Sequence, residues 1–489
     1  MNRNKRCALE TNSESWQSID WKKVIHEVKS LQSRIVKAIK EGRHNKAKAL
    51  QWLLTHSHAA KLYAVKRVTE NTGKRTAGVD GEIWKTFNQK MNAVKSLERK
   101  GYKAKPLKRI YILKKNGKKR PLGIPTMKDR AMQALYLMAL DPIAEAKADT
   151  CSYGFRARRS CADAIARCFI HLSRPDSAKW ILEGDIKGCF DHISHQWLLK
   201  NIPIDKLVLN QWLKAGFIED KQLFPTSEGT PQGGIISPAL ANMTLDGLEQ
   251  CINQAYRAKV RGTGIRKRKK FCINLIRYAD DFVVTASNPE ILELKIKPAI
   301  EAFLEERGLS LSESKTKITN IAEGFDFLGQ NVRKYKDVLF IKPSKGSFTS
   351  IKSKIKDIIV RNRGGKAANL IAQLNPVIRG WGNYHRNIVA KATFVKLDSY
   401  TFWLLWYWAV QQHPNKGRKW IKEKYFKTIG NNQWIFAAKD EKGKQVNIFR
   451  ASQIQIIRHT LIKGEANPYD KDWSSYFASR KKAGYRFPQ

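Results

Sequence analysis

FCINLIRYADDFVVTAS, residues 271–287, is the stretch that decides the fold. Two apolar runs rich in β-branched residues flank Tyr278-Ala279-Asp280-Asp281, which predicts a β-hairpin with two adjacent carboxylates at its tip. Two like charges between buried strands repel, and desolvation raises their pKa. The pattern therefore favours a bound cation, and Mg²⁺ prefers carboxylate oxygen. Taken alone, an Asp-Asp pair is more often the turn of a solvated hairpin.

A second carboxylate follows another predicted strand. In WILEGDIKGCFD, residues 180–191, the apolar strand WIL leads to Asp185, Phe190 comes five residues later, and a helix is expected from about Ser194. An Asp at a strand end is also a common helix cap or turn former. This segment alone therefore leaves both readings open.

Two further segments have the composition of a nucleotide site. RIYILKKNGKKRPLGIP, residues 109–125, predicts a basic hairpin with its turn at Asn116-Gly117. Its cations suit a triphosphate, because Lys and Arg donate to phosphate oxygens, although a solvated basic loop has the same composition. GTPQGG, residues 229–234, opens a helix, and its glycines allow the backbone to approach a ligand closely.

The composition indicates a nucleic-acid partner. The 489 residues include 91 Lys and Arg against 43 Asp and Glu, a formal net charge of +48, and 42% are hydrophobic, as in a globular protein. Such a surface repels itself unless a polyanion neutralises it. A membrane surface is the weaker alternative, because there is no apolar run of about 18 residues and no secretory signal.

The seven cysteines form no C-x-x-C pair, and their number is odd. Neither a zinc site nor a disulfide framework is indicated, which predicts a reduced, intracellular protein.

The C-terminal part differs in composition from the rest. Residues 331–489 contain 32 Lys and Arg against 9 Asp and Glu, and seven of the fourteen tryptophans. The stripe Trp403-x-x-Trp406-x-Trp408 is typical of a helix-bundle core, with a base-stacking platform as the alternative. Basic residues around it predict an outer face that binds backbone phosphates.

The order of these motifs points to nucleotidyl transfer. Two Mg²⁺ ions activate the primer hydroxyl and stabilise the leaving pyrophosphate, and they require carboxylates from neighbouring strands. An Asp on one strand, a Y-x-D-D hairpin about a hundred residues later and a nearby triphosphate clamp meet that requirement together.

Nearly the whole chain resembles the bacterial group II intron reverse transcriptases, also called intron-encoded maturases. The matching segments, in the family's order, are TAGVDG, KKRPLGIP, YGFRARRS, GDIKGCFDH, GTPQGGIISPALANMTLD, RYADD, GLSLSESKT and FDFLG. LNPVIRGWGNYHR and WAVQQHPNK resemble the thumb segment called the maturase or X domain.

The resemblance implies an α+β right-hand polymerase with an antiparallel palm sheet and a helical thumb. The expected domains are an N-terminal helical extension (1–60), fingers and palm (61–335), a thumb or maturase domain (336–425) and a small basic DNA-binding domain (426–489).

The resemblance also implies the metal ligands. Asp185, Asp280 and Asp281 match the catalytic carboxylates that bind two Mg²⁺ ions, and the backbone carbonyl of Ile186 matches the group that completes the second ion's shell.

Five other positions match family residues at the nucleotide. Lys114 and Arg120 match the fingertip residues that grip the triphosphate, and Gln232 lies beside the nascent base pair. Phe190 matches the steric gate against a ribose 2′-hydroxyl, and it is equally suited to a core. Lys315 matches a general acid toward pyrophosphate, with a solvated lysine as the alternative.

The chain departs from the family pattern in three places. Ala157 stands where Gly is frequent, and Leu113 stands where Pro is usual. No cysteine follows Cys272, so we expect no C-terminal zinc-bound H-N-H endonuclease here, and target cleavage is then expected to come from elsewhere.

The implied function is an RNA-directed DNA polymerase that forms a ribonucleoprotein with its group II intron RNA. It assists splicing and copies the intron into DNA during retrohoming, using a DNA target and primer and deoxynucleoside triphosphates. A cytoplasmic, nucleoid-associated bacterial protein is expected. The alternatives are a splicing-only RNA-binding maturase and a domesticated reverse transcriptase in DNA repair or phage defence.

Overall fold

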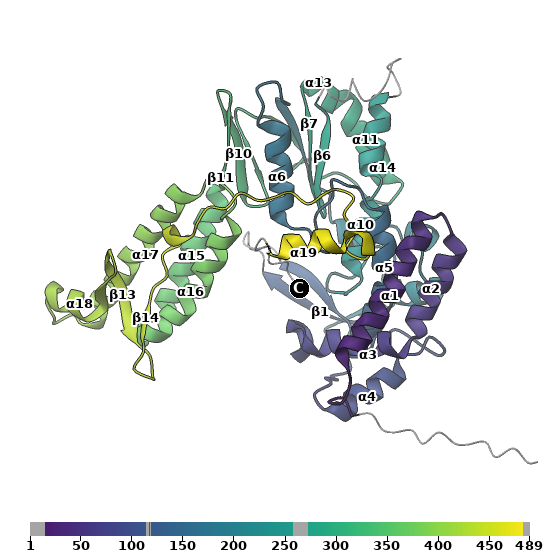
Figure 1. Cartoon of the computed structure of the whole chain (residues 1–489), viewed down its shortest axis with the longest axis horizontal. Coiled ribbons are helices and arrows are strands. Elements are labelled where there is room, and N and C mark those ends of the chain that lie inside the picture. The colour runs from purple at the N-terminus through teal and green to yellow at the C-terminus, as the bar shows by residue number, and fades with distance from the viewer. Residues whose placement is uncertain (1–14, 114–116, 118, 258–271, 483–489) are drawn as a thin grey trace, which may run out of the picture.

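The computed structural model describes residues 15–113, 117, 119–257 and 272–482. Figure 1 shows one lobe of helices and sheets built from the N-terminal and middle parts of the chain, and a second lobe around α15, α16 and α17. The yellow C-terminal segment returns from the second lobe to the first. None of the helices in the described residues combines the length and apolar character that a membrane crossing needs.

A four-stranded sheet in the order β6-β7-β3-β8 lies at the centre of the first lobe, and all its neighbours are antiparallel. The strands are β3 (Trp180–Gly184), β6 (Asn274–Tyr278), β7 (Asp281–Ala286) and β8 (Lys317–Asn320). Because side chains alternate between the two faces of a strand, Ile181 and Val283 join one hydrophobic cluster while Leu182 joins another. The sheet thus separates two cores.

Helices cover both faces of this sheet. The face of Ile181 packs against α6 (Cys161–Leu172). The other face packs against α10 (Ser237–Leu245), α11 (Leu248–Arg257) and α14 (Lys297–Glu305). The short helices are α7 (Cys189–His192), α8 (His195–Asn201), α9 (Lys206–Leu213), α13 (Pro289–Ile291) and a π-helical turn (Leu292–Ile296). Pro298 stands in the first turn of α14, where a proline is tolerated because the N–H it lacks would have no partner within the helix.

The N-terminal helices pack on one long buried helix, α5 (Met127–Lys147). α1 (Trp21–Lys40), α2 (His44–His56) and α3 (His58–Glu70) pack on it directly, and the 3₁₀ turn Thr72–Arg75 and α4 (Phe87–Ser96) pack on α3. Val28 of α1 and Val65 of α3 lie in the same hydrophobic cluster as Leu135 of α5, and Gln32 Nε2 donates to Met138 O at 2.9 Å. These helices therefore form one core with the sheet.

A second four-stranded sheet, in the order β2-β1-β4-β5, contains the predicted basic hairpin. Its strands are β1 (Leu107–Leu113), β2 (Lys119–Ile124), β4 (Phe217–Glu219) and β5 (Gln222–Phe224). The antiparallel pairing of Ile112 with Arg120 confirms the hairpin. Its predicted turn residue Asn116 lies outside the described residues.

The second lobe is a helix bundle with a small sheet on it. A three-stranded sheet leads into it, in the order β11-β10-β9: β9 (Phe325–Phe327), β10 (Gln330–Tyr335) and β11 (Val338–Pro343). The bundle contains α15 (Lys345–Arg361), α16 (Ala367–Tyr384), α17 (Lys391–Gln412) and α18 (Arg418–Tyr425). The small sheet follows, in the order β12-β13-β14: β12 (Phe426–Ile429), β13 (Asn432–Lys439) and β14 (Gln445–Asn447).

The small sheet shares the core of the bundle. Trp408 of α17 meets Tyr425 and Phe436 edge to face, with ring centroids 5.7 and 5.8 Å apart. Residues on both sides of the expected domain limit at 425/426 thus pack together. The limit at 60/61 falls inside α3, and the domain limits remain predictions.

A C-terminal segment, which we call the strap (residues 454–473), connects the two lobes (Figure 1). It follows the 3₁₀ turn Ala451–Gln453 and ends in the 3₁₀ turn Lys471–Trp473 before α19 (Ser474–Lys482). Ile457 N donates to Arg386 O at 2.9 Å in the second lobe. In the first lobe, His459 Nε2 lies 2.8 Å from Asp163 Oδ1 and Arg159 donates to Gly464 O at 2.7 Å.

Candidate active site

The turn between β6 and β7 presents the Asp-Asp pair. Tyr278 pairs with Asp281, so Ala279 and Asp280 form the two-residue loop, and Ala279 has φ +58°. The backbone of Gly154 lies directly against this turn, since a Cβ at Gly154 would stand 2.3 Å from Ala279 N. The glycine of the YGFR segment therefore shapes the turn that carries the acids.

Asp185 directly follows β3, at the sheet edge where this turn lies. Gly184 pairs with Phe282, and a Cβ at Gly184 would stand 2.1 Å from the Phe282 ring. Asp185 O accepts from Ser312 N at 2.8 Å, and the buried Ile186 forms a bridge with Leu311. Backbone pairing thus holds Asp185 close to the Asp-Asp turn.

The three carboxylates lie close enough for their negative charges to repel one another. Burial raises the pKa of Asp280, and the charge of Asp185 raises it further, while Arg120 and Lys315 act in the opposite sense. Partial burial, then the charges of Asp280 and Asp185, raise the pKa of Asp281 to about 6. Lys315 Nζ donates to Asp185 Oδ2 at 2.8 Å. Mutual repulsion of this kind favours a cation among the three groups.

No three His, Cys, Asp or Glu side chains of the described residues are arranged as a ready-made metal cluster. Mg²⁺ usually binds one or two carboxylates and completes its shell with waters and substrate phosphates. Three neighbouring Asp carboxylates are a donor set that fits such an ion, because Mg²⁺ prefers carboxylate oxygen.

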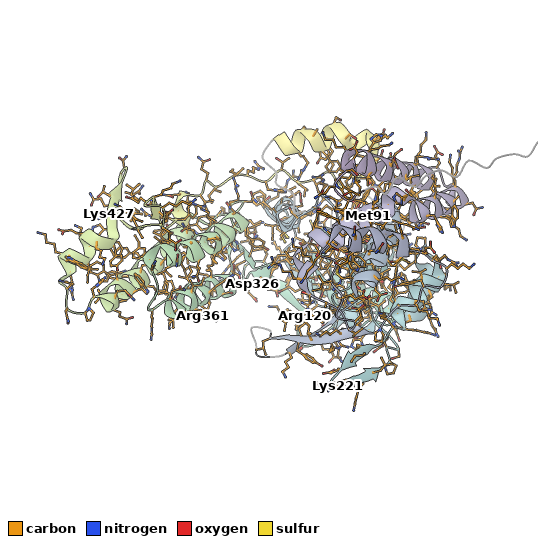
Figure 2. The ribbon with its side chains drawn as sticks, turned by 90° about the horizontal axis from the view of Figure 1, so that it is seen from below. Met91, Arg120, Lys221, Asp326, Arg361 and Lys427 are labelled. Atoms are coloured by element: carbon orange, nitrogen blue, oxygen red, sulfur yellow. The ribbon has the colours of Figure 1, made fainter. Side chains whose placement is uncertain are left out.

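A hydrogen-bonded chain joins the basic hairpin to Asp191 of α7. Arg120 Nε donates to Gln232 Oε1 at 2.7 Å, and Gln232 Nε2 donates to Asp191 Oδ1 at 2.9 Å. Gly123 N donates to Gln232 O at 2.7 Å, so backbone and side chain both fasten the glycine-rich loop to the hairpin. Figure 2 shows Arg120 at the side of the first lobe that faces Asp326 and Arg361. Lys114 lies outside the described residues.

Phe190 is buried in α7, immediately before Asp191. Its ring meets that of Phe155 edge to face at 6.3 Å, and its carbonyl accepts from Thr230 N at 2.6 Å. The same segment therefore positions Phe190 and the partner of Gln232.

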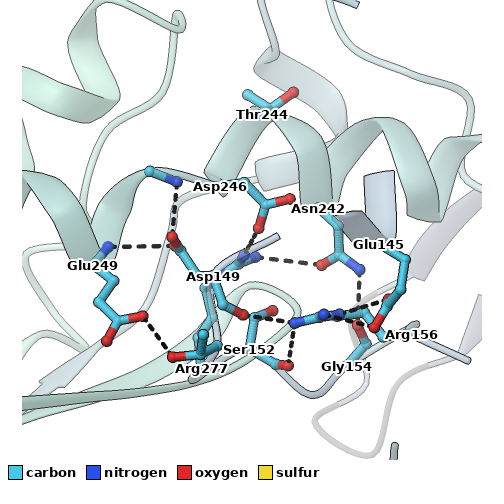
Figure 3. A network of polar contacts seen from close by, with 12 residues as sticks. Glu145, Asp149, Ser152, Gly154, Arg156, Asn242, Thr244, Asp246, Glu249 and Arg277 are labelled. Atoms are coloured by element: carbon cyan, nitrogen blue, oxygen red, sulfur yellow. Dashed lines mark hydrogen bonds and ion pairs between the residues drawn. The ribbon is translucent and has the colours of Figure 1, made fainter. Parts of the chain in front are cut away.

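A buried ionic network surrounds Arg277, the residue before Tyr278 in β6 (Figure 3). Arg277, fully buried and directly before Tyr278, forms an ion pair with Asp246 and donates to Asn242 Oδ1 at 3.3 Å. Asn242 Nδ2 donates to Gly154 O at 2.8 Å. Arg156 is likewise paired with Glu145, at 2.7 Å. The network fixes Gly154 against the turn.

Asp191 and Arg277 are among the residues of the site region that sequence reasoning did not single out. An arginine within the otherwise apolar strand INLIRY and an aspartate one position after Phe190 were the available signals.

Three protein families match successive parts of the chain. The N-terminal domain of reverse transcriptase matches residues 16–97, and reverse transcriptase (RNA-dependent DNA polymerase) matches residues 112–332. The group II intron maturase-specific domain matches residues 348–426. The described carboxylate site lies entirely within the second match.

Curated relatives agree with these matches. Protein YkfC of Escherichia coli (strain K12) is 34% identical over 307 residues, which are 55% of this chain and 80% of YkfC. Group II intron-encoded protein LtrA of Lactococcus lactis subsp. cremoris is 32% identical over 327 residues, 55% of this chain and 54% of LtrA. A 91 kDa protein in the cob intron of Schizosaccharomyces pombe is 26% identical, over 78% of this chain and 56% of its own length. The chain spans about half the length of the last two.

The class that emerges is a reverse transcriptase, an enzyme family that generally depends on divalent metal and acts on nucleic acid. The maturase-specific match and the intron-encoded relatives narrow the class further. The chain belongs to the group II intron-encoded reverse transcriptases, RNA-directed DNA polymerases that also act in intron splicing.

Proposed function

We propose that this chain copies RNA into DNA by two-metal nucleotidyl transfer at Asp185, Asp280 and Asp281. The observation that carries the proposal is the position of Asp185 beside the Asp280-Asp281 turn, where burial and then the charges of Asp280 and Asp185 raise the pKa of Asp281 to about 6. When bound, two Mg²⁺ ions supply an activated primer hydroxyl and neutralise the leaving pyrophosphate. The carboxylates and the main-chain oxygen of Ile186 hold the ions.

The surrounding residues bind and orient the deoxynucleotide in this proposal. Arg120, with Lys114, grips the triphosphate, since guanidinium groups donate to phosphate oxygens in pairs. Gln232 lies beside the new base pair, and Phe190 excludes a ribose 2′-hydroxyl. Lys315 balances the charge of Asp185 and serves as proton donor to pyrophosphate.

The wider activity follows from the right-hand arrangement that we propose for the two lobes. The first lobe provides fingers and palm, the helix bundle of the second provides the thumb, and residues from 426 onward add basic surface for DNA. The protein binds its group II intron RNA as a ribonucleoprotein, supports splicing, and copies the intron at a DNA target. Its +48 charge supports these polyanionic partners.

Metal dependence tests the proposed chemistry. The purified protein is expected to extend a DNA primer on an RNA template only with Mg²⁺, and chelation is expected to stop it. Because a carboxylate with a pKa of about 6 must lose its proton to bind metal, the Mg²⁺ concentration for half-maximal extension should rise as pH falls below 6. Mg²⁺ titrations of primer extension from about pH 5 to pH 8 measure it. A requirement independent of pH across this range contradicts the assignment.

Asp191 is expected to position the nucleotide grip. Its carboxylate fixes the amide of Gln232, so that Oε1 faces Arg120. Asp191→Ala should therefore raise the KM for deoxynucleotides about fivefold with little change in kcat, the effect of one exposed hydrogen bond of about 1 kcal/mol. Steady-state incorporation on an RNA template measures both constants.

Glu228→Ala is the matched control, because it removes the same charge from an exposed carboxylate, one that lies 2.9 Å from His192 Nδ1. Asp191→Asn keeps an acceptor for Gln232 and should restore most of the affinity. Equal KM values for Asp191→Ala and Glu228→Ala would show that Asp191 has no positioning role.

A further inference from the structure

A cavity of about 230 Å³ lies between α17 and β13 in the second lobe, away from the carboxylate site. Figure 1 shows β13 beside the helices of this lobe, at the end remote from the central sheet. The lining includes the aromatic side chains Phe402, Trp403, Trp434 and Phe449. Pockets for drug-sized ligands occupy about 300–1,000 Å³, so this cavity suits a smaller flat group.

Two tryptophans at this cavity are exposed, although a third tryptophan nearby is buried in the core. Trp403 is 54% and Trp434 39% exposed, whereas Trp408 on the same helix is 2% exposed and fills the core. The predicted tryptophan stripe therefore divides into a core part and a surface part. Large apolar side chains gathered at a surface cavity indicate a binding site.

The backbone at Trp434 is strained. Its φ of +58° lies in the left-handed region that bulky residues avoid, and the register of β12 against β13 shifts close by. Lys422 Nζ lies 4.5 Å from the centroid of the Trp434 ring. Such strain persists only where the surroundings enforce it, and it is frequent at ligand clamps.

The rim of the cavity is polar. Gln433, Ser399, Asp398 and Arg450 line it beside the rings. The carboxylate of Asp398 accepts from Ala451 N at 2.7 Å and Ser452 N at 3.0 Å, and it also lies 3.8 Å from Arg450 Nε. A flat ring on a polyanionic backbone is complementary to these aromatic walls, with Lys422 beside Trp434 and Arg450 at the rim as the neighbouring cations.

We propose that this cavity binds one unpaired base of single-stranded RNA, stacked against Trp403 and Trp434. Single-stranded RNA is recognised through splayed bases that stack on aromatic side chains, with phosphates held by nearby cations. The inference rests on the proposed RNA-binding function and adds the kind of RNA element bound. The maturase-specific match, residues 348–426, includes Phe402 and Trp403, which favours RNA over a peptide as occupant.

The test uses the full chain and an RNA of about 12 nucleotides that carries one 2-aminopurine. Trp403→Ala should weaken binding of this strand about tenfold, equal to about 1.4 kcal/mol, and should reduce quenching of the 2-aminopurine. Binding of the same RNA as a duplex should stay unchanged, and so should the salt dependence, because no cation is removed. Trp403→Phe keeps a stacking ring and should restore most of the affinity.

Trp52→Ala is the matched control, an exposed tryptophan, 60% accessible, on α2 of the first lobe. Trp434→Ala should repeat the loss, with thermal melting and primer extension checked to show that it is folded. Wild-type affinity of Trp403→Ala for the single strand overturns the inference, and so does an equal loss for the duplex. If primer extension is normal in either case, the proposed polymerase function still holds. Failure of the base-binding cavity can thus be distinguished from failure of the proposed function.

Discussion

Asp280→Asn combined with Asp281→Asn is expected to lower primer extension on an RNA template by at least about 100-fold, while RNA affinity stays at the wild-type value. Both substitutions keep side-chain size and remove the charge that holds metal. Loss of a mere outer partner of a metal ligand already costs about 10–100-fold, so loss of two ligands should cost more. RNA affinity depends on the basic surfaces, whose Lys and Arg residues these substitutions leave in place.

Glu305→Gln with Glu306→Gln provides the control, since these adjacent acids are exposed at the end of α14 and lie in the same lobe. This control should extend primers normally. Normal primer extension by the double variant of Asp280 and Asp281 would overturn the assignment of these two residues as metal ligands. Loss of RNA binding together with extension would point to a folding defect instead, which a thermal melt detects.

Arg277→Met is expected to cost the largest amount of stability, about 3–5 kcal/mol of unfolding free energy, because it leaves Asp246 without its buried partner. Burial already raises the pKa of Asp246 to about 6. A carboxyl whose pKa is raised in the folded state destabilises the fold once it ionises, so the loss should be larger at about pH 8 than at about pH 5. Denaturant unfolding at both pH values measures it.

The double variant Arg277→Met with Asp246→Leu should recover much of that stability, because replacing a whole buried pair by apolar side chains is often nearly neutral. The unfolding free energy that the double variant still loses should also be independent of pH, since the titrating carboxyl of Asp246 is gone. A double variant less stable than Arg277→Met alone would mean that the pair is not the main interaction of Arg277.

The strands and the position of the acids were predictable from local patterns. The two apolar, β-branched-rich runs that flank Tyr278 to Asp281 indicated the hairpin, and the apolar run before Asp185 indicated β3. Both predictions depend on short apolar runs next to the acids, which the sequence displays directly. The basic hairpin of β1 and β2 followed from the same kind of signal.

Contacts between distant segments were not predictable in this way. Gln232 accepts a hydrogen bond from Arg120 and donates one to Asp191. These two partners lie 112 and 41 residues away from it in the chain. Arg277 is buried because Asp246 and Asn242 meet it, and no local pattern reports such a meeting. The tryptophan stripe was ambiguous for the same reason, since its exposure depends on where β13 packs.

The strap has a consequence for how the molecule assembles. Asp163 and His459 are separated by 296 residues, so the bond between them closes a very long loop. Because synthesis adds about 5–20 residues per second and N-terminal parts fold first, the central sheet can form well before residue 459 exists. The contact between His459 and Asp163 can therefore form only in the last stage of biogenesis, after the central sheet that carries the carboxylates.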